Sequence, residues 1–387
     1  MSLNIKTLGQ VFTPDTIVNK MFSLIKNDGK ILEPSCGDGA FFYPLKIGGA
    51  NIVGIEIDNT ICPENVLCMD FFDYSVSNKF DTIIGNPPYV RFQDIDESTK
   101  NKQYIQNLLD NKVFDKRSNL YLFFIYKSVE HLNDGGELIF VVPRDFLHST
   151  SAANLNNFMY SAGTITDIID LGDAPVFDGA CPNCVIFRFE KGNFTHKTTD
   201  NKNYSVINGQ TYLTKENYTV PFSKLFFVKV GAVSGANSIF ENENGNVEFV
   251  CSETAKTGKT VRAFYNIKAP ELFPYKEQLL QRRVKHFTED NWYMYGRNYY
   301  VSEKPRIYVN MKTRNVAPFF CNDCNAYDGS ILAIFPKFKT NNIDEIKKDL
   351  NAVDWYDLGF VCDGRYLFSQ RSLETTVLPS FFEKYCF

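Results

Sequence analysis

The chain of 387 residues lacks any apolar stretch long enough to cross a bilayer. A membrane-spanning helix needs about 20 apolar residues, and the longest apolar runs, such as residues 138–142, are far shorter. The N-terminus also lacks the basic start and apolar run of a secretory signal. We therefore expect a cytoplasmic protein that has no membrane partner.

Histidine is scarce, and the four histidines are scattered without the spacing of a metal site or a catalytic triad. The ten cysteines also lie at irregular spacings, which is typical of reduced thiols in a cytosolic protein. Two Cys-x-x-Cys pairs, Cys181 with Cys184 and Cys321 with Cys324, lie far apart in the sequence. That separation is outside the usual spacing of zinc ligands, so we expect no bound metal.

The formal net charge of −4 is unusual for a protein that binds nucleic acid. The balance is uneven, however, because residues 256–314 hold 13 basic and 5 acidic residues. A basic stretch of this kind suits contacts with phosphates, but a charge run is also typical of a solvated surface. Charge alone leaves both interpretations open.

The length predicts two domains. In residues 1–220, strand patterns at residues 30–33, 51–56 and 80–84 alternate with helical patterns such as residues 119–132. This alternation is typical of a largely parallel sheet with helices on both faces. Residues 193–220 are rich in Asn, Thr and Lys with little periodicity, so we interpret them as linker-like. Residues 221–387 carry short β-like runs and many aromatics. We expect an α/β domain over residues 1–220 and a mixed, β-rich domain over residues 221–387.

A glycine-containing turn, Glu-Pro-Ser-Cys-Gly-Asp-Gly-Ala at residues 33–40, follows the first predicted strand after the N-terminal helix. Gly37 and Gly39 allow a tight turn and a close approach of the backbone to a ligand. The next helix would face that ligand with its N-terminus. Phe42 stands where a dinucleotide motif has its third glycine, so the turn favours a nucleoside other than NAD.

Two acids follow at the ends of the next predicted strands. Glu56 comes 23 residues after Glu33, near the spacing at which an acid binds ribose hydroxyls. Asp70 ends a further short segment and can accept from the exocyclic amine of a purine, with Phe71 against the ring. Solvent-facing carboxylates at strand ends are common, but the order of these residues favours a nucleoside site.

The most specific signal is Asn86-Pro87-Pro88-Tyr89, directly after a buried strand. Two prolines stiffen the turn and remove its donors, so that the Asn86 amide oxygen and the Pro87 carbonyl offer acceptors only. Hydrogen bonds from an NH2 group to both acceptors favour a tetrahedral nitrogen, whose lone pair can attack a methylsulfonium. Tyr89 supplies a face on which the base can stack.

With these motifs in this order, the chain resembles the gamma class of DNA adenine-N6 methyltransferases from bacterial type II restriction–modification systems. Residues 9–14, 33–39, 56, 70–71 and 86–89 are similar to the family's cofactor and catalytic motifs. Residues 119–136 and 138–143 are similar to the next two segments of the family. Residues 175–177, with residues 185–191, are similar to the segment that offers a second aromatic to the flipped adenine. The resemblance is strong up to about residue 191. It is looser beyond, where residues 233–237 and 295–298 are similar to parts of the family's recognition domain.

The resemblance implies a Rossmann-like doubly wound methyltransferase sheet and a C-terminal, mixed β-rich target-recognition domain. It implies S-adenosylmethionine as cofactor, double-stranded DNA as partner, a flipped-out adenine as substrate and a separate cognate nuclease. The cofactor would be bound by Thr13, Glu33, Gly37, Gly39, Glu56, Asp70 and Phe71. The target base would be held by Asn86, Pro87, Tyr89 and Phe177.

Within the basic stretch, three cations fall in four positions at Arg282, Arg283 and Lys285. Such a cluster is hard to explain by packing, so we predict that these residues contact DNA. Arg297 is predicted to contact DNA as well, because it lies in one of the segments that resemble the recognition domain.

Three other functions share part of this pattern. Protein glutamine methyltransferases also use Asn-Pro-Pro-Tyr, but they are shorter and carry a helical domain before the cofactor motif. An RNA base methyltransferase is not distinguished by the sequence. A catalytically inactive DNA-binding subunit is disfavoured by the intact residues 86–89. Neither the recognition sequence nor the oligomeric state, monomer or dimer, follows from the sequence.

Overall fold

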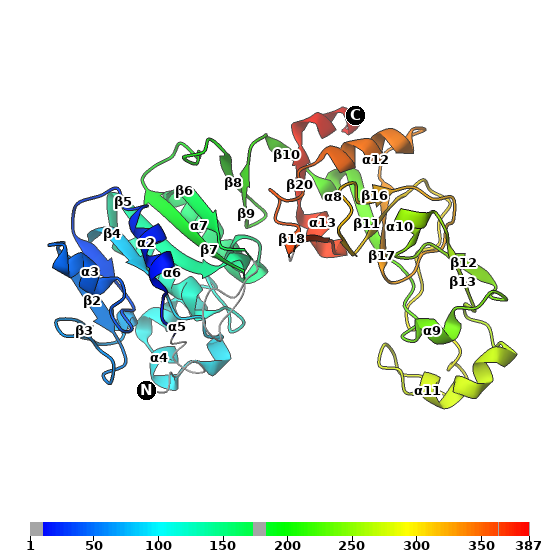
Figure 1. Cartoon of the computed structure of the whole chain (residues 1–387), viewed down its shortest axis with the longest axis horizontal. Helices are drawn as coiled ribbons and strands as arrows, with labels where there is room; N and C mark the ends of the chain where they lie inside the picture. The colour runs from blue at the N-terminus through cyan, green and yellow to red at the C-terminus, as the bar shows by residue number, and fades with distance from the viewer. Residues whose placement is uncertain (1–10, 173–182, 363, 387) are drawn as a thin grey trace. The chain divides into compact units, whose positions relative to one another are not determined.

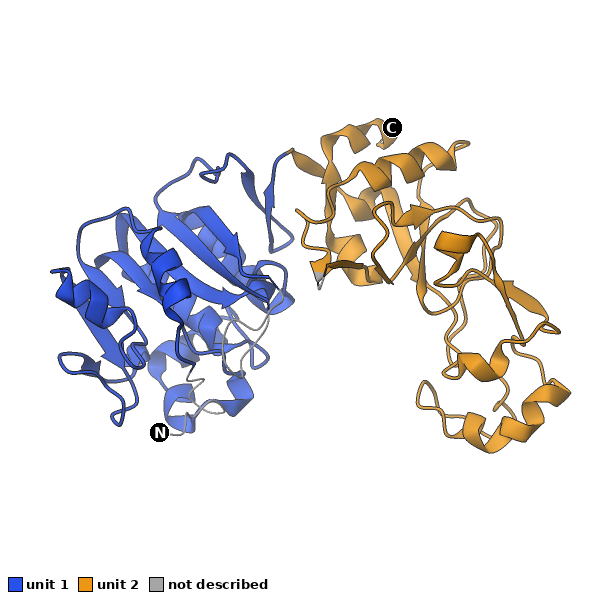
Figure 2. Ribbon diagram, in the orientation of Figure 1, with its two compact units in different colours: residues 1–215 blue, residues 216–387 orange. Residues whose placement is uncertain are grey.

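The computed structural model describes residues 11–172, 183–362 and 364–386. The chain divides into two compact units, Met1–Lys215 and Glu216–Phe387 (Figure 2). The sequence pattern places the boundary near residue 220. In the described part of the chain, no helix has the length and apolar character needed to cross a bilayer.

A seven-stranded sheet forms the centre of the first unit (Figure 1). Its order is β3-β2-β1-β4-β5-β7-β6; β7 runs antiparallel to both neighbours, and the other pairs are parallel. The strands are β1 (Ile31–Glu33), β2 (Ile52–Glu56), β3 (Leu67–Cys68), β4 (Phe80–Gly85), β5 (Leu132–Pro143), β6 (Gly163–Asp170) and β7 (Cys184–Lys191).

Helices cover both faces of this sheet because its strands are apolar on both sides. Ile83 packs into the core formed with α5, α6 and α7, whereas the next residue, Ile84, packs into the core formed with α2 and α3. The predicted doubly wound α/β sheet is thus confirmed. The helices are α2 (Asp15–Phe22), α3 (Phe42–Ile47), α4 (Glu97–Lys100), α5 (Gln103–Asp110), α6 (Leu120–His131) and α7 (Ala153–Ala162), with the 3-10 turns η1 (Phe71–Asp73), η2 (Phe92–Asp94), η3 (Arg144–Leu147) and η4 (Thr150–Ala152).

The strand order reverses at β1, which lies between β2 and β4. After β1 the chain builds β2 and β3 on one side, and it then returns to place β4 on the other. In open α/β sheets, ligands bind outside the carboxyl ends of the strands at such a point. The residues that follow β1 and β4 therefore lie at the expected position of a ligand site.

A β-hairpin occupies residues 203–214 of the stretch that the sequence pattern suggested was linker-like. Strands β8 (Asn203–Ile207) and β9 (Gln210–Thr214) pair antiparallel. Asn208 and Gly209 connect them with φ values of 53° and 75°, as a two-residue type I′ turn requires. Asn-Gly is a strong hairpin signal, and it corrects the linker-like interpretation for residues 203–214.

The second unit contains several small antiparallel sheets, in agreement with the predicted mixed, β-rich domain. Its largest sheet has the order β11-β17-β14-β16. The strands are β10 (Tyr218–Pro221), β11 (Phe226–Val230), β12 (Val247–Phe249), β13 (Val261–Ala263), β14 (Ile307–Asn310), β15 (Lys312–Thr313), β16 (Phe319–Phe320), β17 (Ile331–Pro336), β18 (Val361–Cys362), β19 (Arg365–Leu367) and β20 (Val377–Pro379). The helices are α8 (Phe222–Leu225), α9 (Asn237–Phe240), α10 (Thr254–Thr257), α11 (Lys276–Leu280), α12 (Ile343–Ala352) and α13 (Gln370–Thr375), with η5 (Pro270–Tyr275) and η6 (Ser380–Tyr385).

Candidate active site

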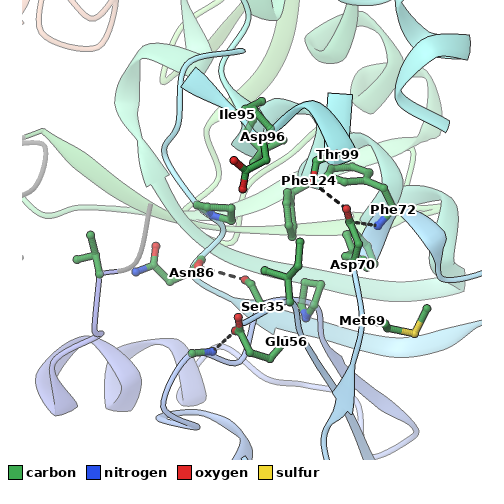
Figure 3. A pocket seen from close by; sticks show the side chains of 17 residues that line it. Ser35, Glu56, Met69, Asp70, Phe72, Asn86, Ile95, Asp96, Thr99 and Phe124 are labelled. Carbon is green, nitrogen blue, oxygen red and sulfur yellow. Dashed lines mark hydrogen bonds between the residues drawn. The ribbon is translucent and has the colours of Figure 1, made fainter. Parts of the chain in front are cut away.

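A cavity opens at the carboxyl edge of the parallel sheet, where the strand order reverses (Figure 3). Its walls come from the segments that follow β1, β2, β3 and β4, from the loop before α4 and from α6. The lining residues are Val11, Pro34, Ser35, Gly37, Glu56, Ile57, Met69, Asp70, Phe71, Phe72, Asn86, Pro88, Ile95, Asp96, Thr99, Leu120 and Phe124. Five of the predicted site residues therefore line the same cavity: Gly37, Glu56, Asp70, Phe71 and Asn86.

Glu56 ties the glycine turn to the end of β2. Its Oε2 accepts from the Gly37 N–H at 2.7 Å, and its Oε1 accepts from the Asp58 N–H at 2.9 Å. Gly37 has a φ of 54°, which glycine adopts without strain. Burial raises the pKa of Glu56, while these N–H groups act in the opposite direction. Each carboxylate oxygen retains a lone pair, with which Glu56 can accept from ligand hydroxyls.

Asp70 is held in a similar way at the start of η1. Its Oδ1 accepts from the Phe72 N–H at 2.8 Å, and its Oδ2 accepts from the Thr99 hydroxyl at 2.9 Å. The adjacent Phe71 ring stacks on Phe124 of α6, with ring centroids 5.1 Å apart. A carboxylate and an aromatic pair thus lie together at this end of the cavity, which suits the amine and the ring of a purine.

Asn86 presents an unpaired acceptor just beyond β4. Its amide nitrogen donates to the Thr13 hydroxyl at 3.2 Å, and its backbone carbonyl accepts from the Ser35 hydroxyl at 3.3 Å. The buried Oδ1 has no hydrogen-bond partner among the described residues. Since a buried polar atom without a partner is costly, this oxygen is suited to accept from a ligand.

The other residues predicted to hold the base lie behind or beside the cavity wall. Pro87 is buried and does not line the cavity. The half-buried Tyr89 donates its hydroxyl to the Val141 carbonyl at 2.8 Å, and its ring meets Tyr121 edge-on. Phe177 lies outside the described residues. The hydrogen bond to Val141 and the contact with Tyr121 fix the orientation of the Tyr89 ring, but Tyr89 does not line the cavity.

Three predicted cofactor residues support the wall without lining it. Thr13 fixes the Asn86 amide. Gly39 has a φ of 87°, and a Cβ at this position would lie 2.6 Å from the Tyr43 ring. Glu33 is 1% exposed, its Oε2 has no partner in the described structure, and burial raises its pKa well above the usual value of 4.5.

Several wall residues were missed by the sequence interpretation, among them Ser35, Asp96, Thr99 and Phe124. Ser35 lies inside the glycine motif at residues 33–40, and this position could have identified it as a site residue. Phe124 is one of many apolar residues on α6, and nothing local distinguishes it. Asp96 is the N-cap of a helix of four residues, and Thr99 lies within that helix. The position of the helix over the cavity depends on tertiary contacts.

In the second unit, Arg282 is buried, whereas Arg283, Lys285 and Arg297 are exposed. The Arg282 guanidinium donates to the carbonyls of Leu279, Ser234, Trp292 and Met294. It also lies over the Phe287 ring at 3.8 Å, and burial lowers its pKa to about 10. This geometry assigns Arg282 a structural role and does not support a direct contact with phosphate.

No group of three His, Cys, Asp or Glu side chains is arranged to hold a metal ion in the ranges that the structure describes. Cys184, Cys321 and Cys324 are free thiols. Cys181, the other half of the first Cys-x-x-Cys pair, lies outside the described residues.

Comparison with known proteins finds that this chain is similar to restriction–modification methylases. Residues 51–177 match the sequence model of the Eco57I restriction-modification methylase family. The chain is 36% identical over 219 residues to the type II methyltransferase M.HincII of Haemophilus influenzae, an alignment that covers 54% of this chain and 42% of that protein. It is 24% identical over 406 residues to M.AccI of Acinetobacter calcoaceticus, covering 91% and 69%.

The match to M.HincII thus spans less than half of that relative's length. Among solved structures, the type IIL restriction–modification enzyme MmeI, determined in complex with DNA, is similar in fold. Its TM-score is 0.55 at 13% identity, over 95% of this chain and 68% of MmeI. These similarities confirm the resemblance drawn from the motifs: the chain is similar to type II restriction–modification DNA methyltransferases.

Proposed function

We propose that this relative of the type II restriction–modification methyltransferases is a site-specific DNA methyltransferase. It transfers a methyl group from S-adenosylmethionine to the N6 amine of an adenine flipped out of the duplex. The observation that carries this proposal is the buried Oδ1 of Asn86 at the cavity wall, which has no partner in the described ranges. Asn86 stands directly before two prolines and Tyr89.

The residues of the cavity fit the nucleoside part of S-adenosylmethionine. Glu56 keeps lone pairs for the ribose hydroxyls, and Asp70 keeps lone pairs for the purine amine. Phe71 and Phe124 supply apolar surface for the ring. The backbone at Gly37, close to Glu56, allows the near approach that a ligand requires. The cofactor supplies a methyl group on a positively charged sulfonium.

Asn86 and Pro87 would activate the adenine amine. Their two oxygens accept the two amine hydrogens, which favours a tetrahedral nitrogen and leaves its lone pair free to attack. Thr13 keeps the Asn86 amide nitrogen engaged, so that Oδ1 is the atom available to the substrate. Tyr89, oriented by the Val141 carbonyl, and Phe177 would stack on the extruded base.

The DNA surface that we propose in the second unit combines three segments that are separate in sequence. Arg282 binds the Ser234 carbonyl, and the Val233 N–H bonds to the carbonyl of Arg297 at 2.9 Å. Val284 is packed so closely against Gly296 that a Cβ there would lie 2.4 Å from it. Arg283, Lys285 and Arg297 are exposed around this cluster and would contact phosphates or base edges.

The relatives named above support a place in a restriction–modification system. Methylation by this protein would then protect host DNA from a separate nuclease with the same recognition sequence. A host that expresses the gene should carry N6-methyladenine at one short sequence. Sequencing of its methylated adenines would identify that sequence.

The decisive experiment measures transfer of labelled methyl groups from S-adenosylmethionine to duplex DNA, RNA and protein, followed by mass spectrometry of the product. We expect N6-methyladenine in DNA. Asn86→Ala should lower kcat by roughly 100-fold or more, because the lost interaction acts mainly in the transition state. Cofactor affinity should change little.

Asn107→Ala is the matched control, because Asn107 is exposed on α5 and lies away from the cavity. It should retain wild-type activity. A methylated glutamine or a methylated RNA base as the main product would replace the proposed function with one of those activities. A kcat of Asn86→Ala within a few-fold of wild type would remove Asn86 from the chemistry.

A further inference from the structure

The charged residues in the cavity wall are all acidic. Glu56, Asp70 and Asp96 line it, and no lysine or arginine is among the described lining residues. Lys127 lies behind the wall, where it is 1% exposed and donates to the Phe71 carbonyl at 2.8 Å. The cavity therefore presents negative charge to any ligand that enters it.

Asp96 differs from the other two acids because no part of the described structure binds its carboxylate. It occupies the N-cap of α4, where an aspartate commonly accepts from a backbone N–H, yet its side chain makes no such bond. Figure 3 shows its oxygens directed into the cavity, from the wall opposite Ser35 and Glu56. Its neighbour Glu97 instead pairs with Lys100 at 2.8 Å.

We propose that Asp96 determines the charge specificity of the cofactor site: its carboxylate favours the cationic sulfonium of S-adenosylmethionine over the neutral thioether of S-adenosylhomocysteine. This inference rests on the proposed methyltransferase function. Asp96 would then be the residue of the site that distinguishes the cofactor from the product.

The two ligands differ by one methyl group and one positive charge. Methyl transfer removes the charge because the electron pair of the broken C–S bond stays on sulfur. The amine nitrogen gains the methyl group and loses a proton to water. Ribose and purine are the same in both ligands, so the hydrogen bonds of Glu56 and Asp70 cannot separate them. An unpaired carboxylate aimed into the cavity attracts only the charged form more strongly.

Product release follows from the same difference. Once the sulfonium has become a thioether, the attraction to Asp96 is lost, and the product is held by the contacts that both ligands share. Asp96 thus weakens product inhibition without touching the reacting amine.

Calorimetry of the full chain with each ligand tests this inference, with Asp96→Asn as the variant. Asparagine has nearly the same size and is an equally good N-cap, so α4 is retained. We expect the Kd of S-adenosylmethionine to rise roughly three- to tenfold, as the loss of one partly screened charge pair would cause. The Kd of S-adenosylhomocysteine should stay within about twofold of wild type.

Two control variants and one ligand analogue define the effect. Glu97→Gln removes an adjacent carboxylate that is exposed and does not line the cavity, and it should leave both Kd values unchanged. Asp96→Glu keeps the charge and should preserve most of the preference. An analogue with an ammonium in place of the sulfonium should follow S-adenosylmethionine in every variant.

The binding results test the role of Asp96 separately from the proposed methyltransferase function. If wild type binds neither ligand, the proposed function fails. If both ligands bind and Asp96→Asn changes their affinities equally or not at all, the role of Asp96 fails while the methyltransferase function stands.

Discussion

Two carboxylates at this site, those of Glu56 and Asp70, are oriented by hydrogen bonds within the protein before a ligand arrives. Both oxygens of Glu56 and both oxygens of Asp70 accept hydrogen bonds from backbone N–H groups or from Thr99. Glu33 is different, because its Oε2 is buried without a partner in the described structure. Burial of Glu33 therefore makes the stability of the protein depend on pH even without a ligand.

Glu33→Gln should make the protein more stable near neutral pH. Burial raises the pKa of Glu33 well above 4.5, so the folded state keeps the proton while the unfolded chain ionises. Stability therefore falls as pH rises above 4.5, and each pKa unit of difference is worth about 1.4 kcal/mol. We expect the variant's advantage in Tm to be small at pH 4 and to grow towards pH 7.

Thermal unfolding of both proteins across this pH range provides the measurement. Glu64→Gln, which alters an exposed carboxyl between β2 and β3, should show no such growth. A difference between Glu33→Gln and wild type that does not depend on pH would contradict the burial of a protonated Glu33.

Among the elements, the β8–β9 hairpin belongs to the first unit through its side chains. Tyr204 and Leu213 are buried in the same core as α6 and α7, and the Asn156 amide donates to the Gly209 carbonyl at 2.9 Å. The turn between the two strands is therefore anchored on α7. Its geometry depends on the two residues with positive φ.

Gly209→Ala should destabilise the first unit by about 1–2 kcal/mol or more. Gly209 has a φ of 75°, and a Cβ at this position would lie 2.4 Å from the Ala153 side chain. The strain of a left-handed conformation contributes about 1–2 kcal/mol, and the contact with Ala153 adds to it. Chemical denaturation followed by circular dichroism measures the loss.

Asn208→Gly is the control for this turn, because Asn208 also has a positive φ, 53°, which glycine adopts freely. It should change the free energy of unfolding little. Equal stability of Gly209→Ala and wild type would mean that the hairpin does not pack on α7 as described.

Over the whole molecule, basic charge is concentrated in residues 256–314, although the net charge is −4. Within that stretch two adjacent arginines have different environments. Arg282 is buried with its guanidinium on backbone carbonyls, and Arg283 is exposed. This contrast separates residues that build the surface from those that are free to contact DNA.

Arg282→Met and Arg283→Met should therefore have different effects. Arg282→Met leaves buried carbonyls without donors, which we expect to cost at least about 2 kcal/mol in the free energy of unfolding. Arg283→Met should leave stability unchanged, weaken DNA binding and reduce the slope of log K against log salt by about 0.9 for one lost phosphate contact.

Denaturation and DNA titrations at several salt concentrations test the pair. If Arg283→Met binds DNA with unchanged affinity and salt slope, Arg283 does not face DNA. If binding weakens at one base pair only, Arg283 reads a base edge instead of the backbone.

The order of elements in the first unit followed from hydrophobic patterning. The strands predicted around residues 30–33, 51–56 and 80–84 are β1, β2 and β4, and the helix predicted at residues 119–132 is α6. Carboxyl ends of parallel strands meet at one edge of the sheet. The strand pattern, together with the motifs at the strand ends and the family resemblance, therefore predicted Glu56, Asp70 and Asn86 in one site.

The same reasoning failed where position depends on contacts between distant segments. Phe124 reads as one more apolar residue of a buried helix, and it reaches the cavity only because α6 packs behind η1. Asp96 and Thr99 lie in a short segment without periodicity. Arg282 has the sequence context of a surface cation, yet segments 233–237 and 292–294 enclose it.

The sequence alone thus determined the centre of the candidate site: the glycine turn, the two acids and Asn86 with its prolines are local motifs whose order sets their place on a parallel sheet. Only the tertiary structure decided which side chains complete the cavity and which cations remain exposed. The physical reason is that local patterns specify which face of an element is apolar, whereas burial of a particular Arg282 or exposure of a particular Asp96 depends on long-range packing that no local pattern records.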